Sequence, residues 1–148
     1  KAEVWACDMS ATALEVAAKN ASIMGAAVQF QQLNFLDPQQ RDQLPVFDII
    51  ISNPPYVPLK DKAQMNPNVL EHEPAMALFV PDNDPLVFYQ AIADFSLTHL
   101  SPGGSIYTEI HEDLGTATAE IFQAAGYLTE LKKDMQGKER MIRAERSR

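Results

Sequence analysis

Four consecutive residues, Asn53-Pro54-Pro55-Tyr56, combine the groups needed to hold a planar amine. Each proline fixes its φ at about −65° and has no N–H to donate, and the residue before a proline is kept out of the helical region. We call these four residues the lip. Its acceptors, the Asn53 side-chain oxygen and the proline carbonyls, would take the two hydrogens of an NH2 group while the Tyr56 ring covers the flat face. The lip therefore predicts a site for an amide or an aromatic amine.

The stretch before the lip, residues 46–52, is mostly apolar and rich in β-branched side chains. Such a run predicts a strand buried on both faces of a parallel sheet. Ligands of open α/β sheets bind beyond the carboxyl ends of these strands, which is where the lip lies. The alternative is a Pro-Pro turn that only ends the strand, with Asn53 as a turn former.

Strands and helices alternate along the rest of the chain. Ser10 is a helix N-cap and Gly25 a helix stop, which predicts a helix from Ser10 to about Met24. Asp84-Pro85 is a second helix start. The further predicted segments are strands at 1–8, 28–33, 105–110, 127–132 and 140–144, helices at 84–99 and 113–125, and a turn at 101–104.

Two further residues could contact a nucleoside. Asp8 follows a predicted strand, and an acid at the tip of the second strand of a Rossmann-like sheet binds ribose hydroxyls; it could equally cap the next helix. Phe35 follows another predicted strand and could lie on an adenine or pack in the core. The long connection at about 57–84 is typical of a binding loop or lid. Its Glu71-His72-Glu73-Pro74 lacks a second pair of ligands at helical spacing, so we expect no metal site.

Charge is divided unevenly along the 148 residues, although the net value is −8. Residues 1–131 carry five basic and seventeen acidic side chains, whereas 132–148 carry seven basic and three acidic ones. A duplex-binding protein needs a basic face to neutralise phosphates, so we expect no direct nucleic-acid binding. Cys7 is the only cysteine, and no run approaches a membrane span or signal peptide. We therefore expect a cytoplasmic protein with no disulfide and no membrane contact.

The chain resembles the HemK/PrmC family, the glutamine-N5 methyltransferases of peptide chain release factors. The resemblance covers nearly all of it, from Ala6-Cys7-Asp8 to the segment 133–140. Its most specific blocks are Ser52-Asn53-Pro54-Pro55-Tyr56-Val57-Pro58, Glu73-Pro74-Ala75-Met76-Ala77-Leu78, Pro102-Gly103-Gly104 and Glu109-Ile110.

The resemblance implies a Rossmann-like class I methyltransferase fold with S-adenosylmethionine as methyl donor and S-adenosylhomocysteine as product. Asp8 would hold the ribose hydroxyls. Phe35 and Asn34, which stands where the family usually has an acid, would lie by the adenine. Asn53, Pro54, Pro55 and Tyr56 would hold the glutamine of a Gly-Gly-Gln loop in a release factor, with Asn53, Pro54 and Tyr56 acting in catalysis and Asn53 also contacting the cofactor.

The family's first strand and glycine-rich loop have no counterpart here, because the six glycines never take a Gly-x-Gly spacing. We therefore expect a methyltransferase domain truncated before its second strand, and an exposed sheet edge beside residues 46–52 that invites self-association. Two other hypotheses remain. The lip could grip the exocyclic amine of a flipped adenine or guanine, or the chain could be an inactive folding or docking unit.

Overall fold

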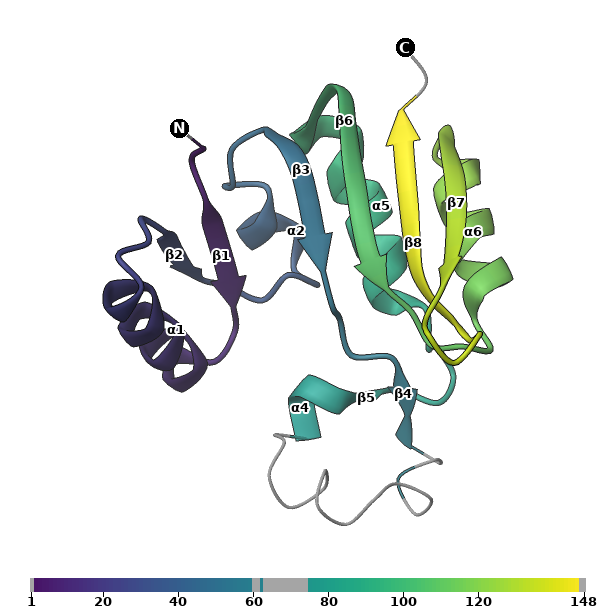
Figure 1. The fold of residues 1–148 in the computed structure, drawn as a ribbon, viewed down its shortest axis with the longest axis horizontal. Helices are drawn as coiled ribbons and strands as arrows, with labels where there is room; N and C mark the ends of the chain where they lie inside the picture. The colour runs from purple at the N-terminus through teal and green to yellow at the C-terminus, as the bar shows by residue number, and fades with distance from the viewer. Residues whose placement is uncertain (1, 60–61, 63–74, 147–148) are drawn as a thin grey trace. The chain divides into compact units, whose positions relative to one another are not determined.

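The computed structural model describes residues 2–59, 62 and 75–146, and the chain divides into two compact units (Figure 1). The first unit is Lys1–Leu44 and the second is Pro45–Arg148. Each unit contains its own pair of parallel strands. Each of the two therefore carries its own carboxyl strand ends, the place where α/β sheets bind ligands.

The first unit begins with two parallel strands, β1 (Trp5–Asp8) and β2 (Gln29–Gln32), joined by helix α1 (Ala11–Ile23). The helix begins where predicted, because the Oγ of Ser10 accepts the N–H of Ala13 at 3.2 Å. It ends before Gly25, whose φ of +62° suits a residue without a Cβ. The predicted helix and both strands are thus confirmed.

A short helix that the sequence analysis did not predict follows β2. This helix, α2 (Pro38–Arg41), begins at Asp37, whose Oδ1 accepts the N–H of Gln39 at 2.9 Å. Proline at the first helical position needs no hydrogen-bond partner there, because it has no N–H. Leu33, which precedes this helix in the sequence, and Leu44, which follows it, are both buried.

The second unit is built on a four-stranded sheet in the order β3, β6, β8, β7. β3 and β6 run parallel, and β8 runs antiparallel to both of its neighbours. The two predicted closing strands are confirmed as a hairpin. The strands are β3 (Phe47–Ser52), β6 (Leu100–Glu109), β7 (Tyr127–Lys133) and β8 (Glu139–Arg146).

Two helices pack on this sheet, α5 (Val87–His99) against β6 and α6 (Gly115–Ala124) against β7 and β8 (Figure 1). The two helices also contact each other. Their apolar residues meet those of the strands in a single core. Its most deeply buried large side chains are Tyr89, Phe122, Ile106, Ile110 and Ile142.

The strand before the lip is half-buried at best, and not buried on both faces as predicted. Ile49 and Ile51 of β3 have exposed fractions of 57% and 79%, whereas Ile50 between them is half-buried. β3 is the terminal strand of its sheet and pairs only with β6. Alternate residues of a strand point to opposite faces, so the face without helices leaves these isoleucines open.

Two predicted boundaries were also wrong. Helix α5 begins at Val87 and not at Asp84-Pro85, because the N–H of Asp84 bonds the carbonyl of Pro81 at 3.1 Å and closes a turn first. Strand β6 runs through residues 101–104, which we had predicted as a turn. Leu100 pairs with Phe47 and Ser105 with Ile49, so the glycines of this segment lie in a bulge between the two pairs.

The connection after the lip is only partly described. Strand β4 (Val57–Pro58) pairs in parallel with β5 (Phe79–Val80), which follows the one-turn helix α4 (Ala75–Leu78). The sequence Glu71-His72-Glu73-Pro74 lies outside the described residues. Whether the segment at about 57–84 acts as a lid therefore stays a prediction.

Candidate active site

The lip leaves the sheet at the carboxyl end of β3 and has no regular secondary structure. Its residues differ in exposure: Asn53 is exposed, Pro54 is buried, and Pro55 and Tyr56 are half-buried. The buried proline anchors a segment whose first side chain faces solvent. The predicted geometry, a stiff turn that presents the Asn53 amide, is thus present.

The acceptors of the lip are available. Among the residues that the structure describes, neither the Asn53 side chain nor the Pro54 carbonyl has a hydrogen-bond partner. An amide oxygen and a backbone carbonyl both accept hydrogen bonds from N–H groups. The two groups can therefore bind both hydrogens of an NH2 group without giving up an existing bond.

Tyr56 contacts Glu109, the last residue of β6, and His111, which follows that strand. Its hydroxyl donates a 2.7 Å hydrogen bond to Oε1 of Glu109, and its ring meets the His111 ring edge to face, with centroids 6.0 Å apart. Burial, followed by the hydrogen bond and the charge of Glu109, raises the pKa of Tyr56 to about 12. The phenol is therefore neutral and its hydroxyl is committed to Glu109.

Glu109 also accepts a hydrogen bond from a second tyrosine, Tyr89. The Tyr89 hydroxyl of α5 donates to the Glu109 carbonyl at 3.1 Å, and burial raises the pKa of Tyr89 as well. Glu109 belongs to one of the blocks that carry the family resemblance, but no role was predicted for it, nor for Tyr89 or His111. The adjacent carboxyl ends of the parallel strands β3 and β6 could have indicated Glu109, but the pairing of those two strands was not evident from the sequence.

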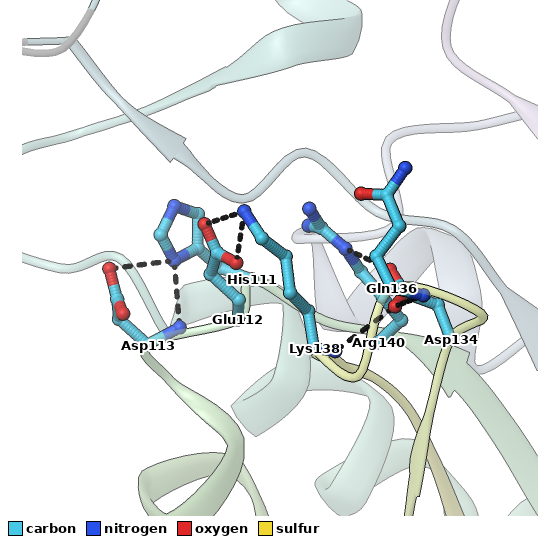
Figure 2. A network of polar contacts seen from close by, with 7 residues as sticks. All are labelled: His111, Glu112, Asp113, Asp134, Gln136, Lys138 and Arg140. Atoms are coloured by element: carbon cyan, nitrogen blue, oxygen red, sulfur yellow. Dashed lines mark hydrogen bonds and ion pairs between the residues drawn. The ribbon is translucent and has the colours of Figure 1, made fainter.

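A polar network fixes the segment that follows β6 (Figure 2). Lys138 forms an ion pair with Glu112 at 2.7 Å, and Arg140 forms one with Asp134 at 3.4 Å. The first contact holds the segment after β6 against the turn between β7 and β8, and the second lies within that hairpin. The hydrogen bond from Lys138 lowers the pKa of Glu112, and the backbone N–H of Lys138 lowers that of Asp134.

Two contacts with Asp113 orient the His111 ring (Figure 2). The backbone N–H of Asp113 donates to His111 Nδ1 at 3.2 Å. The same nitrogen lies 3.8 Å from Oδ2 of Asp113. These contacts hold the imidazole beside the Tyr56 ring.

The predicted nucleoside contacts lie in the first unit. Asp8 ends β1, and its Oδ1 accepts the N–H of Ser10 at 2.7 Å. Asp8 thus shapes the turn before α1, but the N-cap of that helix is Ser10 and not Asp8 as the alternative proposed. It is exposed, and its Oδ2 has no hydrogen-bond partner among the described residues. One carboxylate oxygen therefore remains available for a hydroxyl donor.

Asn34 and Phe35 form the loop after β2. The Oδ1 of Asn34 accepts the N–H of Leu36 at 3.0 Å, so this side chain organises the loop. Phe35 is half-buried, with the guanidinium of Arg41 5.8 Å from its ring centroid. Arg41 also donates to the Phe35 carbonyl at 3.1 Å. The ring is therefore neither fully in the core nor fully open.

The residues predicted to act together thus form two sets. Asn53, Pro54, Pro55 and Tyr56 lie in the second unit, and Asp8, Asn34 and Phe35 lie in the first. In the part of the chain that the structure describes, no three His, Cys, Asp or Glu side chains group as metal ligands, and no helix is long and apolar enough to cross a bilayer.

The fold is that of methyltransferases. A methyltransferase from Pyrococcus furiosus superposes with a TM-score of 0.65 over 97% of this chain and 62% of its own, at 18% identity. The order of the strands, with two closing antiparallel strands, is the Rossmann-like class I arrangement that we predicted.

The chain belongs to the methyltransferase small domain family, whose model matches residues 1–75. It is similar to the release factor glutamine methyltransferases of Flavobacterium psychrophilum, at 43% identity over 143 residues, and of Bacteroides thetaiotaomicron, at 40% over 146 residues. The matches cover 96% and 98% of this chain but 50% and 52% of the relatives. The chain thus spans about half the length of these curated relatives, and the predicted resemblance is confirmed.

Proposed function

We propose that the protein transfers a methyl group from S-adenosylmethionine to the side-chain amide nitrogen of a glutamine, in the Gly-Gly-Gln loop of a peptide chain release factor. The proposal rests on two acceptors of the lip, the Asn53 amide oxygen and the Pro54 carbonyl, neither of which has a hydrogen-bond partner among the described residues. The names of the curated relatives support the same substrate class. This assignment places the protein in the cytoplasm with its substrate.

The acceptor amide nitrogen is a poor nucleophile because its lone pair is delocalised into the carbonyl. The same resonance gives a peptide bond its rotation barrier of ~18–20 kcal/mol. In the proposal, Asn53 and Pro54 accept both N–H bonds of the glutamine side chain, which orients the nitrogen and increases its electron density. The Tyr56 ring lies against the amide plane, which directs the lone pair along one line. Positioning of this kind supplies a large part of many enzymatic rate accelerations.

The first unit offers groups for the methyl donor. Asp8 has one carboxylate oxygen free at an exposed strand end, as binding of ribose hydroxyls requires, and Phe35 and Asn34 lie in the loop after the neighbouring strand. When bound, S-adenosylmethionine supplies an electrophilic methyl group on a sulfonium, and S-adenosylhomocysteine is its product. The amide proton passes to water.

A methyl-transfer assay with labelled S-adenosylmethionine tests the proposal. The full-length protein is incubated with a release factor, with the same factor carrying alanine at the Gly-Gly-Gln glutamine, and with unmethylated duplex and single-stranded DNA. Label on the first substrate alone supports the proposal. Label on DNA supports the amino-methyltransferase of nucleic acids instead, and label on none of the three supports an inactive docking unit.

A further inference from the structure

Two tyrosines from separate segments converge on one residue, Glu109. Tyr56 of the lip donates to its carboxylate at 2.7 Å, and Tyr89 of α5 donates to its backbone carbonyl at 3.1 Å. Glu109 is therefore bonded to the segment after β3 through its side chain and to a core helix through its main chain. Few residues could connect the lip more directly to the buried part of the second unit.

The position of Glu109 follows from the strand register. Ser52 and Thr108 are paired across β3 and β6, so Glu109 ends its strand beside the first residue of the lip. Hydrogen bonds in which the acceptor is ionised are shorter and about twice as strong as neutral ones. The Tyr56–Glu109 bond is of this kind, and it is half-buried, where water competes less for either partner.

The bond also limits what Tyr56 can do. Because its one hydroxyl hydrogen is directed at Glu109, Tyr56 does not donate that hydrogen to a substrate. What remains for the substrate is the face of the ring, and His111 covers that ring from its edge. The orientation of the ring, and of the two residues before it, is then set by the bond to Glu109.

We propose that Glu109 is a positioning residue, which holds Tyr56 and thereby keeps the acceptors of the lip aligned on the glutamine amide. This inference rests on the proposed function and adds a residue to it. Glu109 acts through Tyr56 and not as a base, so the property it must supply is an acceptor oxygen, and the charge on that acceptor strengthens the bond. Glutamine retains an acceptor oxygen at this position, whereas alanine does not.

The test compares kcat, KM and S-adenosylhomocysteine affinity of the full-length protein in five forms: Glu109→Ala, Glu109→Gln, Tyr56→Phe, the double variant Glu109→Ala/Tyr56→Phe, and Glu145→Ala. Each single loss of the hydrogen bond should lower kcat by about 10-fold to 100-fold, the range for a hydrogen bond to a charged group. The double variant should be no slower than the slower single variant, because both remove the same bond. Glu109→Gln should recover most of the rate.

Glu145→Ala is the matched control. Glu145 lies on β8 of the same sheet and also accepts a side-chain hydroxyl bond, from Ser105 at 3.0 Å. It has no bond to the lip, so its loss should leave kcat within about two-fold, as expected for a surface substitution. Cofactor affinity should change far less than kcat in all five forms, since Asp8, Asn34 and Phe35, three of the four proposed cofactor contacts, lie in the first unit.

Three results would overturn the inference. Wild-type kcat in both Glu109→Ala and Tyr56→Phe would remove the positioning role. Multiplied losses in the double variant would mean independent roles, and Glu109→Gln as slow as Glu109→Ala would mean that the charge or basicity is required. If Glu109→Ala does not fold, Tyr56→Phe and Glu109→Gln still decide the question. Failure of the proposed function itself would appear separately, because the wild-type protein would then transfer no label to the release-factor glutamine.

Discussion

Ser52 of β3 and Thr108 of β6 are register partners in a parallel strand pair, so the residues that follow them, Asn53 and Glu109, lie next to each other at the carboxyl ends of the two strands. One of these residues presents an unpaired amide to solvent, and the other receives the hydroxyl of Tyr56. The register of the two strands thus places a binding group and a positioning group at the same end of the sheet.

Asn53→Ala should lower the rate of glutamine methylation by at least ~10², because the substrate amide loses one of its two acceptors. The measurement is steady-state kinetics on a release factor with the full-length protein. Asn20→Ala, at an exposed position of α1, is the control and should match the wild type. Turnover near the wild-type value in Asn53→Ala would rule out this role.

Asp8→Asn should weaken S-adenosylhomocysteine binding by about ten-fold or more, the loss expected when a hydrogen bond to a charged group is removed. Asparagine keeps an oxygen for the N–H of Ser10 and so keeps the turn before α1. Calorimetric titration measures the affinity, and far-UV circular dichroism checks that the helix is intact. Glu15→Gln, an exposed substitution on α1, should bind as the wild type does. Equal affinity in Asp8→Asn would show that the free oxygen of Asp8 does not hold the ribose.

Alkaline pH should destabilise the fold through Tyr56. A phenol titrates at about 10 when the chain is unfolded, and the pKa of Tyr56 rises to about 12 in the folded protein because of burial first and Glu109 second. A raised pKa means that the folded state favours the protonated form. The stability from this group is complete below pH 10 and is lost as the pH rises towards 12.

Urea unfolding between pH 9 and pH 12, at intervals of about half a pH unit, would measure this loss. Tyr56→Phe has no phenol to ionise and should show a smaller decline over that range. The titration of the phenol, followed by ultraviolet absorbance, should also move to lower pH in Glu109→Ala. An identical pH dependence in the wild type and in Tyr56→Phe would contradict the assignment.

Gly104→Ala should destabilise the second unit by about 1–3 kcal/mol, the cost typical of overpacking. A Cβ at this position would lie 2.8 Å from the Leu100 side chain and 2.9 Å from the backbone oxygen of Asp48 on β3. The backbone contact cannot relax without moving a strand. Equilibrium unfolding in urea gives the free energy, and a stability equal to that of the wild type would show that β3 and β6 can separate freely here.

The exposed edge of β3 should support self-association of the 148-residue chain. Ile51 has an exposed fraction of 79% on a terminal strand, and such edges pair with other chains unless a charge blocks them. Sedimentation velocity across a range of concentrations should show less association in Ile51→Lys than in the wild type. Leu128→Lys, at an exposed fraction of 68% on the opposite terminal strand β7, is the matched control. Equal association in all three forms would show that the β3 edge is not the contact.

Local signals in the sequence were sufficient for much of the fold and for the lip. Ser10 and Gly25 set the ends of α1 by capping, and the proline pair of the lip limits its own backbone, because each effect acts within a few residues. Where the local signal was ambiguous, the prediction failed: Asp84-Pro85 can begin a helix or close a turn, and the bond to Pro81 decided for the turn.

Tertiary structure alone decided the partners of the lip. Glu109 lies 53 positions after Tyr56, and no periodicity of the sequence indicates which strands pair or in which register. The exposure of Ile49 and Ile51 also depends on which strands pair, since the same apolar sequence can form a central strand or a terminal one. The sequence by itself determined which groups could bind an amide. The pairing of β3 with β6, a contact between distant segments, determined what holds those groups in place.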